Sequence, residues 1–273
     1  MHPPTAKGLL VFSHGNSFPA STYRVMFAEL ERRGFTVKAV ERFGHDPRFP
    51  VTPNWPHLVD ELFEFAEAEA VKAGQPAWLV GHSLGGFLST LCAARHPEIA
   101  RGVLMLDSPL IGGWKAHVLH AAKRTALAGQ VGPGAISRRR RDRWDSAEEV
   151  LAYLRRKKIF AQWDPRVLHD YVKHGTRSEG GQRVLAFSRE VETAIYNTLP
   201  HHLARVLARH PLQCPAAFIG GLHSRERELV GMALTDKVTE GRITLLEGSH
   251  LFPMEKPVAT AATIEAALLG MVG

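Results

Sequence analysis

The sequence predicts an α/β protein with a mostly parallel sheet, for two reasons. Short apolar runs bounded by turn residues alternate with helical patterns, as expected for strands joined by crossover helices. The 273 residues are 45% hydrophobic and 22% charged, which allows a sizeable core in one α/β unit. We expect about six strands, near residues 8–13, 36–41, 77–82, 101–107, 215–220 and 242–247.

Helical patterns fill the intervals between several of these strands. The pattern after the second strand begins beside Asn54 and Pro56, which are residue types that favour a helix start. Within it, Leu58, Leu62 and Ala66 recur at helical spacing and should face the sheet. Helices are expected on both faces of the sheet, and four of them lie near residues 21–33, 57–73, 85–95 and 257–271.

Residues 111–211 break the alternation of strands and helices. They contain glycine-rich turns and helix-start signals such as Ser146 with Glu149, but no convincing strand. They are also basic, with a net charge of +10 against −3 for the rest of the chain. We therefore predict a helical cap at 111–211, inserted into a core domain made of 1–110 and 212–273.

Composition also bounds the cellular setting and the partners. Cys92 and Cys214 are too few for a disulfide framework, so buried free thiols in a reducing compartment are expected. The N-terminal residues lack the apolar segment of a signal peptide, and no run approaches the length of a membrane span. These features predict a cytoplasmic protein that does not bind membranes. We expect a monomer or a homodimer.

The basic run RRRRDR at 138–143 is the main low-complexity segment. Charge runs are usually solvated, and no motif or aromatic-interleaved surface for nucleic acid accompanies this one. We therefore predict no nucleic-acid partner. A basic cap can also favour an anionic substrate through its local potential, and the sequence leaves that role open.

The strongest chemical signal is LVGHSLGGF at residues 79–87, which contains the pattern G-x-S-x-G around Ser83. This pattern places a serine on a strained turn between a strand and a helix, and its glycines let that turn close. The sequence has the required context, with an apolar strand before the motif and a helical pattern after it. Ser83 is therefore the predicted nucleophile.

Two further turns complete the predicted site. The His-Gly turn FSHGNS after the first strand can point a backbone N–H at the nucleophile, so Asn16 and Leu84 are the predicted oxyanion-hole donors, with Ser17 as the alternative. His250 follows the last strand in LLEGSHLFPMEKP and suits the general base that takes the serine proton.

These motifs, in this order, make the chain resemble the α/β-hydrolases. The similarity covers roughly residues 8–110 and 212–273, and 111–211 fits the cap that this family inserts after its sixth strand. The usual N-terminal β-hairpin has no room before LLVFSHG, so about six strands are expected instead of eight. A serine at the nucleophile position argues against dehalogenase chemistry, which in this family uses aspartate there.

The acid of the Ser-His-acid set is harder to assign. Family members most often place it just beyond the strand before the last one, and in FIGGLHSRERELV that slot holds His223 or Ser224. Glu226 comes slightly later and alternates with arginines, a pattern typical of a charged helix start. Other members take the acid from the strand after the nucleophile helix, where this chain has Asp107. Asp107 is the predicted acid, and Glu226 is the alternative.

The resemblance implies a serine hydrolase that cleaves a carboxylic ester or thioester and needs no cofactor or metal. His82, Trp114 and Trp163 are candidates for the substrate pocket, although the tryptophans would serve equally well to hold the cap on the core. Acyl transfer, carbon–carbon bond hydrolysis and perhydrolysis on the same residues stay open. So does a ligand-binding homologue without activity.

Overall fold

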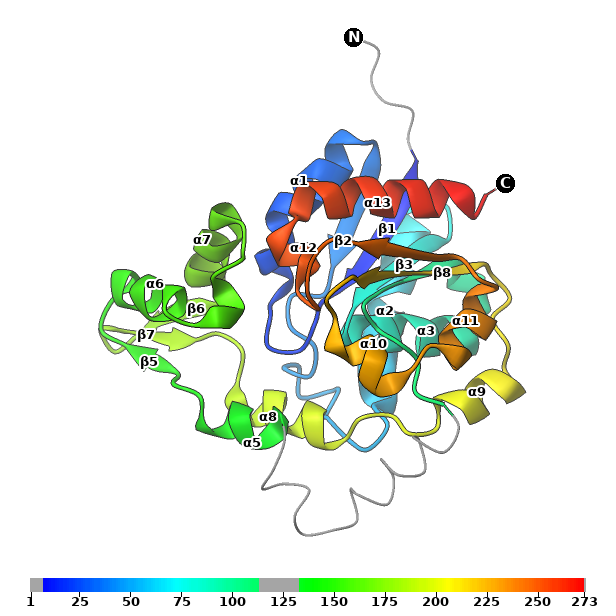
Figure 1. Ribbon diagram of the computed structural model, residues 1–273. Coiled ribbons are helices and arrows are strands. Elements are labelled where there is room, and N and C mark those ends of the chain that lie inside the picture. Colours follow the sequence, from blue (N-terminus) through cyan, green and yellow to red (C-terminus); the bar gives the residue numbers. More distant parts are fainter. Residues whose placement is uncertain (1–6, 113–132, 273) are drawn as a thin grey trace.

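The computed structural model describes residues 7–112 and 133–272, which form an α/β architecture around one central sheet (Figure 1). The sheet has six strands in the order β2-β1-β3-β4-β8-β9, and every neighbouring pair is parallel. The predicted fold class is thus confirmed. The strands are β1 Gly8–Ser13, β2 Phe35–Ala39, β3 Ala77–His82, β4 Ala100–Leu106, β8 Ala216–Gly221 and β9 Ile243–Leu246.

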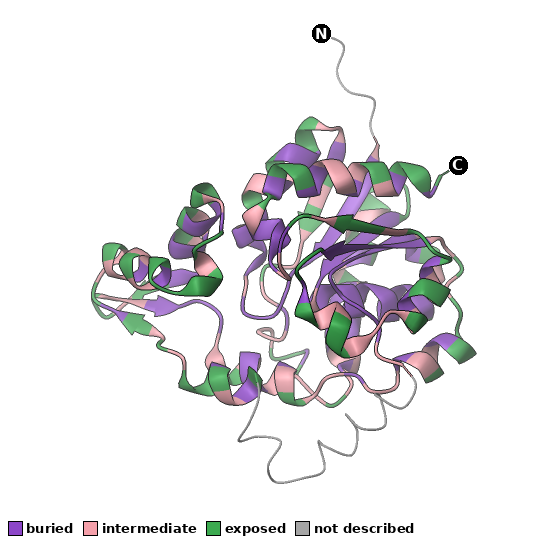
Figure 2. Cartoon of the chain, in the orientation of Figure 1, coloured by how far each residue is buried: buried purple, intermediate pink, exposed green. Residues whose placement is uncertain are grey.

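The central strands are apolar because both of their faces are covered. Every residue of β1, β3 and β8 is buried, whereas the edge strands β2 and β9 are partly exposed (Figure 2). Successive side chains of a strand point to opposite faces. Leu9 and Val11 accordingly pack in one core layer, and Leu10 and Phe12 pack in the other.

Each face of the sheet is covered by helices (Figure 1). One layer includes α2 and α3, and the apolar stripe Leu58, Leu62 and Ala66 is fully buried in it, as the helical spacing predicts. The other layer includes α1 and α13. The bounds of these four helices are α1 Arg24–Arg32, α2 Pro56–Ala73, α3 Leu84–Arg95 and α13 Pro257–Gly270.

The segment between β4 and β8 is described from residue 133 onward, and we call residues 133–211 the inserted segment. Ser146 Oγ accepts a hydrogen bond from the Glu149 N–H at 3.1 Å, as the capping signal predicts, and Asp164 caps the next helix. The helices of the segment are α5 Pro133–Arg139, α6 Ala147–Arg155, α7 Pro165–His174, α8 Arg189–Asn197 and α9 Leu203–Arg209, with the 3₁₀ turn η3 Lys158–Phe160.

The inserted segment also contains strands, which the sequence did not lead us to expect. A small antiparallel sheet has the order β5-β7-β6, with β5 Arg143–Trp144, β6 Thr176–Glu179 and β7 Gln182–Leu185. Its hairpin turns at Gly180 and Gly181, both with positive φ. The strands are short and largely polar, so they lack the apolar alternation that marks a strand in sequence.

The remaining elements are short. They are η1 Ala20–Tyr23 after β1, η2 Pro97–Ile99 before β4, α10 Arg225–Val230 and α11 Ala233–Thr239 between β8 and β9, and α12 Phe252–Glu255 before α13. Both cysteines are free thiols, Cys92 buried and Cys214 partly buried. In the described ranges, no helix has the length and apolar character needed to span a bilayer.

Candidate active site

Ser83 lies on a sharp turn between β3 and α3. Its backbone has φ +53°, a conformation that is strained for any residue other than glycine. The flanking glycines permit the turn, because a Cβ on Gly81 would lie 2.1 Å from the backbone of Gly85. A Cβ on Gly85 would lie 1.9 Å from the carbonyl oxygen of Ser13. The G-x-S-x-G spacing is therefore a steric requirement of this turn.

Three chain segments bring Ser83, His250 and Asp107 together. Ser83 follows β3, Asp107 follows β4, and His250 lies in the turn after β9, so all three stand at the carboxyl edge of the parallel sheet. His250 Nε2 lies 3.1 Å from Ser83 Oγ, and His250 Nδ1 lies 2.6 Å from Asp107 Oδ2. This is the geometry in which a serine can pass its proton to an imidazole that a carboxylate orients.

Asp107 is held firmly at the end of β4. It is buried, and its oxygens accept hydrogen bonds from the Gly221 N–H at 2.9 Å and from Ser224 Oγ. Burial opposes ionisation, but the hydrogen bond from His250 and these two donors outweigh it and lower the pKa of Asp107. A carboxylate in this setting stays ionised while it fixes the imidazole.

The structure also brings Glu226, the alternative acid, close to His250. Glu226 Oε2 lies 3.8 Å from His250 Nδ1 and 3.1 Å from Ser224 Oγ, and its side chain is far more exposed than that of Asp107. The slot where an acid was first expected holds His223, which is exposed and paired with Glu247, and Ser224, which donates to Asp107. The supporting role of Ser224 was not anticipated from the sequence.

His250 is the predicted base, and its surroundings favour its protonated form. Burial disfavours the charge, but the hydrogen bond to Asp107 and the negative charge of Glu226 raise the pKa of His250. A protonated imidazole at this position is thus stabilised by two carboxylates on the Nδ1 side.

The same three side chains are the one group of potential metal ligands in the described ranges. One ligand atom from each of Asp107, Glu226 and His250 lies within 4.8 Å of the others. A metal on Nδ1 of His250 would replace the hydrogen that bonds Asp107 at 2.6 Å. Metal binding and the orientation of this histidine by Asp107 therefore exclude one another.

The predicted oxyanion donors come from two places: Asn16 and the alternative Ser17 lie in the loop after β1, and Leu84 lies at the start of α3. Within the described ranges, neither the Asn16 nor the Leu84 backbone N–H donates a hydrogen bond to a protein acceptor. The Ser17 N–H, by contrast, donates to Asn16 Oδ1 at 3.1 Å. Leu84 opens α3, whose dipole favours negative charge at that end. The pair Asn16 and Leu84 is thus better suited to an oxyanion than Ser17.

His82 differs from our expectation of a pocket-lining residue. It is completely buried, and both ring nitrogens meet protein atoms: the Tyr23 hydroxyl at 2.7 Å and the His250 carbonyl oxygen at 2.9 Å. The Tyr23 oxygen also accepts from the Gly15 N–H at 3.0 Å. Burial first, and then His250, lower the pKa of His82 to about 3, so it stays neutral. A buried chain thus links the loop after β1 to the backbone of His250.

Comparison with known proteins agrees with this geometry. The chain matches the model of the alpha/beta hydrolase family over residues 10–263, which is most of its length. The chain belongs to the alpha/beta hydrolase family.

Individual relatives are distant. The chain is 26% identical, over 96% of its length and 88% of the relative's, to a candidate non-heme haloperoxidase of Mycobacterium phage D29. It is 23% identical to a monoglyceride lipase homolog of Monkeypox virus, over 63% of this chain and 61% of that one. The two names describe different reactions, so neither carries over directly.

Solved structures share the fold. E-2-(acetamidomethylene)succinate hydrolase superposes with a TM-score of 0.72 at 22% identity, over 96% of this chain and 92% of that one. The thioesterase domain from the curacin biosynthetic pathway gives a TM-score of 0.64 at 16% identity, over 96% and 92% of the two chains. These identities establish the likeness of fold alone.

Two other predicted pocket residues of this alpha/beta hydrolase belong to residues 111–211, the predicted cap. Trp114 lies outside the described residues. Trp163 is buried and packs its ring against Phe18 of the loop after β1, with ring centroids 5.5 Å apart, and against Tyr171. This placement joins the inserted segment to the loop beside the nucleophile.

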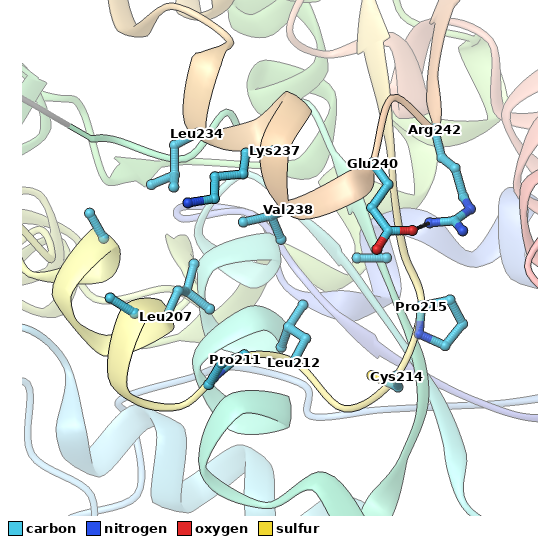
Figure 3. Close-up of a pocket in the computed structure, with 13 residues that line it drawn as sticks. Leu207, Pro211, Leu212, Cys214, Pro215, Leu234, Lys237, Val238, Glu240 and Arg242 are labelled. Atoms are coloured by element: carbon cyan, nitrogen blue, oxygen red, sulfur yellow. Dashed lines mark ion pairs between the residues drawn. The ribbon is translucent and has the colours of Figure 1, made fainter.

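Figure 3 shows a separate cleft. Its lining includes Pro215 and Ala216 at the start of β8, Arg242 just before β9, and apolar side chains of α9 and α11. Those are the amino ends of the strands, whereas Ser83, Asp107 and His250 follow carboxyl ends. The cleft is thus at the opposite edge of the sheet from the candidate site.

Proposed function

We propose that this chain is a serine hydrolase that cleaves a carboxylic ester or thioester through an acyl-enzyme on Ser83. The observation that carries the proposal is the continuous set of contacts from Ser83 Oγ to His250 at 3.1 Å and from His250 to the buried Asp107 at 2.6 Å. The family supports hydrolase chemistry, and one relative is named a monoglyceride lipase homolog, which acts on an ester.

The first half of the reaction forms the acyl-enzyme. Ser83 Oγ attacks the acyl carbonyl carbon while His250 Nε2 takes its proton, and Asp107 holds the Nδ1–H and stabilises the imidazolium. The N–H groups of Asn16 and Leu84 bind the oxygen that becomes negative in the tetrahedral intermediate. His250 then gives its proton to the leaving alcohol or thiol as the carbon–oxygen or carbon–sulfur bond breaks.

The second half releases the acid. His250 takes a proton from a water molecule, whose oxygen attacks the acyl carbon of the ester on Ser83. The second tetrahedral intermediate collapses, Ser83 Oγ takes back its proton from His250, and the carboxylic acid leaves. In this scheme the predicted cap at 111–211 covers the acyl group, and the contact of Trp163 with Phe18 in the loop after β1 supports that role.

The test is covalent labelling by a fluorophosphonate probe, followed by assay on p-nitrophenyl esters and acyl-CoAs of graded chain length. The folded wild type should be labelled once, at Ser83. Ser83→Ala should lose the label and about 10⁶-fold in kcat. The exposed Ser178→Ala should behave as wild type. An unlabelled wild type, or equal labelling of Ser83→Ala, would refute the proposal.

A further inference from the structure

One buried carboxylate of the inserted segment has no part in the scheme above. Glu192 of α8 is only 4% exposed, and each of its oxygens has a partner. Ser17 Oγ donates to Oε1, and Arg140 Nη1 donates to Oε2 at 2.8 Å. The carboxylate therefore lies between a serine of the loop after β1 and an arginine of the inserted segment.

Glu192 also bonds to that loop through its backbone. Asn16 Nδ2 donates to the Glu192 carbonyl oxygen at 3.1 Å. One residue of the inserted segment thus holds the side chains of Asn16 and Ser17, two consecutive residues some 175 positions away in the chain. Asn16 is the residue whose backbone N–H is a proposed oxyanion donor.

The loop needs this support because its backbone is strained. Ser17 has φ +79°, in the left-handed region that costs a residue with a side chain about 1–2 kcal/mol. Such a conformation persists only where surrounding contacts hold it. Here the Ser17 hydroxyl is fixed by Glu192, and its N–H is fixed by Asn16 Oδ1. The Asn16 N–H belongs to the preceding peptide unit, and its direction is constrained through Asn16 itself, whose side chain is bonded to the Glu192 carbonyl oxygen and to the Ser17 N–H.

Arg140 anchors Glu192 from the opposite side. Its second guanidinium nitrogen donates to the Tyr171 hydroxyl at 2.8 Å, and its own carbonyl oxygen accepts from Arg189 at 3.1 Å. A buried carboxylate without a compensating partner would be strongly destabilising, and Arg140 supplies that partner. Arg140 belongs to the basic run 138–143, so one arginine of that run has a defined structural role instead of a solvated one.

We infer that Glu192 is a positioning residue through which the inserted segment fixes the oxyanion-binding loop. The inference rests on the proposed function. Glu192 touches no reacting atom and acts through Ser17 and Asn16. Stabilisation of the tetrahedral intermediate then depends on how the inserted segment is docked, in addition to the geometry of the core sheet.

Ser17→Ala tests the tie to the loop alone, because it leaves Glu192 and Arg140 paired. An oxyanion donor acts mainly on the transition state, so a displaced donor should lower kcat more than it raises KM. We expect kcat to fall about tenfold with KM within about twofold, and inhibition by an alkyl boronic acid, which forms a tetrahedral adduct, to weaken by a similar factor.

Glu192→Gln tests the tie together with the ion pair, and Glu190→Gln is its matched control. Glu190 lies on the same helix, is exposed, and bonds to Ser188. Glu192→Gln should lose at least as much kcat as Ser17→Ala, whereas Glu190→Gln should stay within about twofold of wild type. Thermal unfolding of each variant identifies any loss that comes from misfolding.

Amide hydrogen exchange of the loop gives a readout that does not depend on activity. A peptide containing residues 14–17 should exchange faster in Ser17→Ala and Glu192→Gln, while a peptide containing 83–86 should be unchanged. Unchanged exchange in the loop, or wild-type kcat and boronic acid affinity in both folded variants, would overturn the inference. An inactive, unlabelled wild type would instead refute the proposed function, and exchange would still decide the role of Glu192.

Discussion

The carboxyl edge of the core sheet and the inserted segment both contribute residues to the candidate site, but their residues are positioned in different ways. At the sheet edge, Ser83 and Asp107 follow directly on their strands and His250 lies in the turn after β9, so the parallel topology itself brings them to one edge. The inserted segment contributes through side-chain contacts, among them Glu192 on the loop after β1 and Trp163 on Phe18. Its geometry depends on packing and not on strand order.

This difference predicts two kinds of variant. Substitutions at the sheet edge should remove chemical groups and affect the rate by orders of magnitude, with little change in folding. Substitutions at contacts with the loop should displace groups that are still present, so their effects on rate should be smaller. The following variants test where that division holds, from the largest expected effect to the smallest.

Among Asp107→Asn, Tyr23→Phe and Glu226→Gln, we expect Asp107→Asn to have the largest effect on the rate. The amide cannot stabilise the imidazolium, and it can favour the wrong tautomer of His250, so kcat should fall about 10³- to 10⁴-fold while KM changes little. Single-turnover and steady-state assays on one activated ester measure this. Thermal unfolding should show that the variant is folded.

Comparing Asp107→Asn with Glu226→Gln decides which of the two carboxylates is the acid. Glu226 lies 3.8 Å from His250 Nδ1 and could replace part of the lost charge, so Asp107→Asn combined with Glu226→Gln should be slower than Asp107→Asn alone. Near-full turnover in Asp107→Asn, together with a large loss in Glu226→Gln, would show that Glu226 is the acid.

The sheet edge is also the part that the sequence predicted best. Apolar runs ending in GHS, in LDS and in EGSH mark the carboxyl ends of three parallel strands, and these must lie at one edge. Burial of a strand on both faces demands a continuous apolar run, which is why such strands are readable in sequence. Asp107 was chosen because no aspartate follows β8. In the structure, Asp107 Oδ2 lies 2.6 Å from His250 Nδ1.

The contacts of the inserted segment could not be predicted in this way. Ser17, Arg140 and Glu192 are ordinary polar residues in sequence, and nothing in their spacing shows that they meet. Its short polar strands were missed for a related reason, since partly exposed strands carry no continuous apolar pattern. His82 was predicted to line the substrate pocket because it is a polar residue next to the predicted nucleophile in sequence. In the structure it is buried and bonds to Tyr23 and to the backbone of His250 instead.

Tyr23→Phe tests that buried link and should have an intermediate effect. Removing the hydroxyl leaves the Gly15 N–H and His82 Nδ1 without their partner, at about 1–3 kcal/mol for each buried group. We expect a lower melting temperature and a loss of kcat of about tenfold or less, because both linked segments lie next to the site. Chemical denaturation and steady-state kinetics measure the two effects.

Tyr153→Phe is the control for Tyr23→Phe. Tyr153 is partly exposed in the inserted segment, and its ring contacts Arg141 and Lys157, which a phenyl ring would preserve. It should change neither stability nor kcat appreciably. If Tyr23→Phe is as stable and active as this control, the chain from Gly15 to His250 does not support the site.

Glu226→Gln should have the smallest effect on the maximal rate and should instead change the pH profile. The base must be neutral to accept the serine proton, so kcat/KM falls on the acid side as His250 becomes protonated. Four groups surround this histidine: Asp107, Glu226 and Glu255 raise its pKa, and the neutral His82 does not add charge. The acid limb of wild type should therefore lie above the ordinary histidine pKa of about 6.5.

Removing the charge of Glu226 should make the imidazolium less stable, lower the pKa of His250 and move the acid limb to lower pH. The side chain of Glu226 is 43% exposed, so high salt should screen it and reduce the difference from wild type. Glu228→Gln, an exposed residue of the same helix, should leave the limb in place. A shift of the acid limb to higher pH in Glu226→Gln, or a large loss of its plateau rate, would mean that Glu226 does more than adjust the charge around His250. The helix α10 would then supply a catalytic group, as the strand ends do.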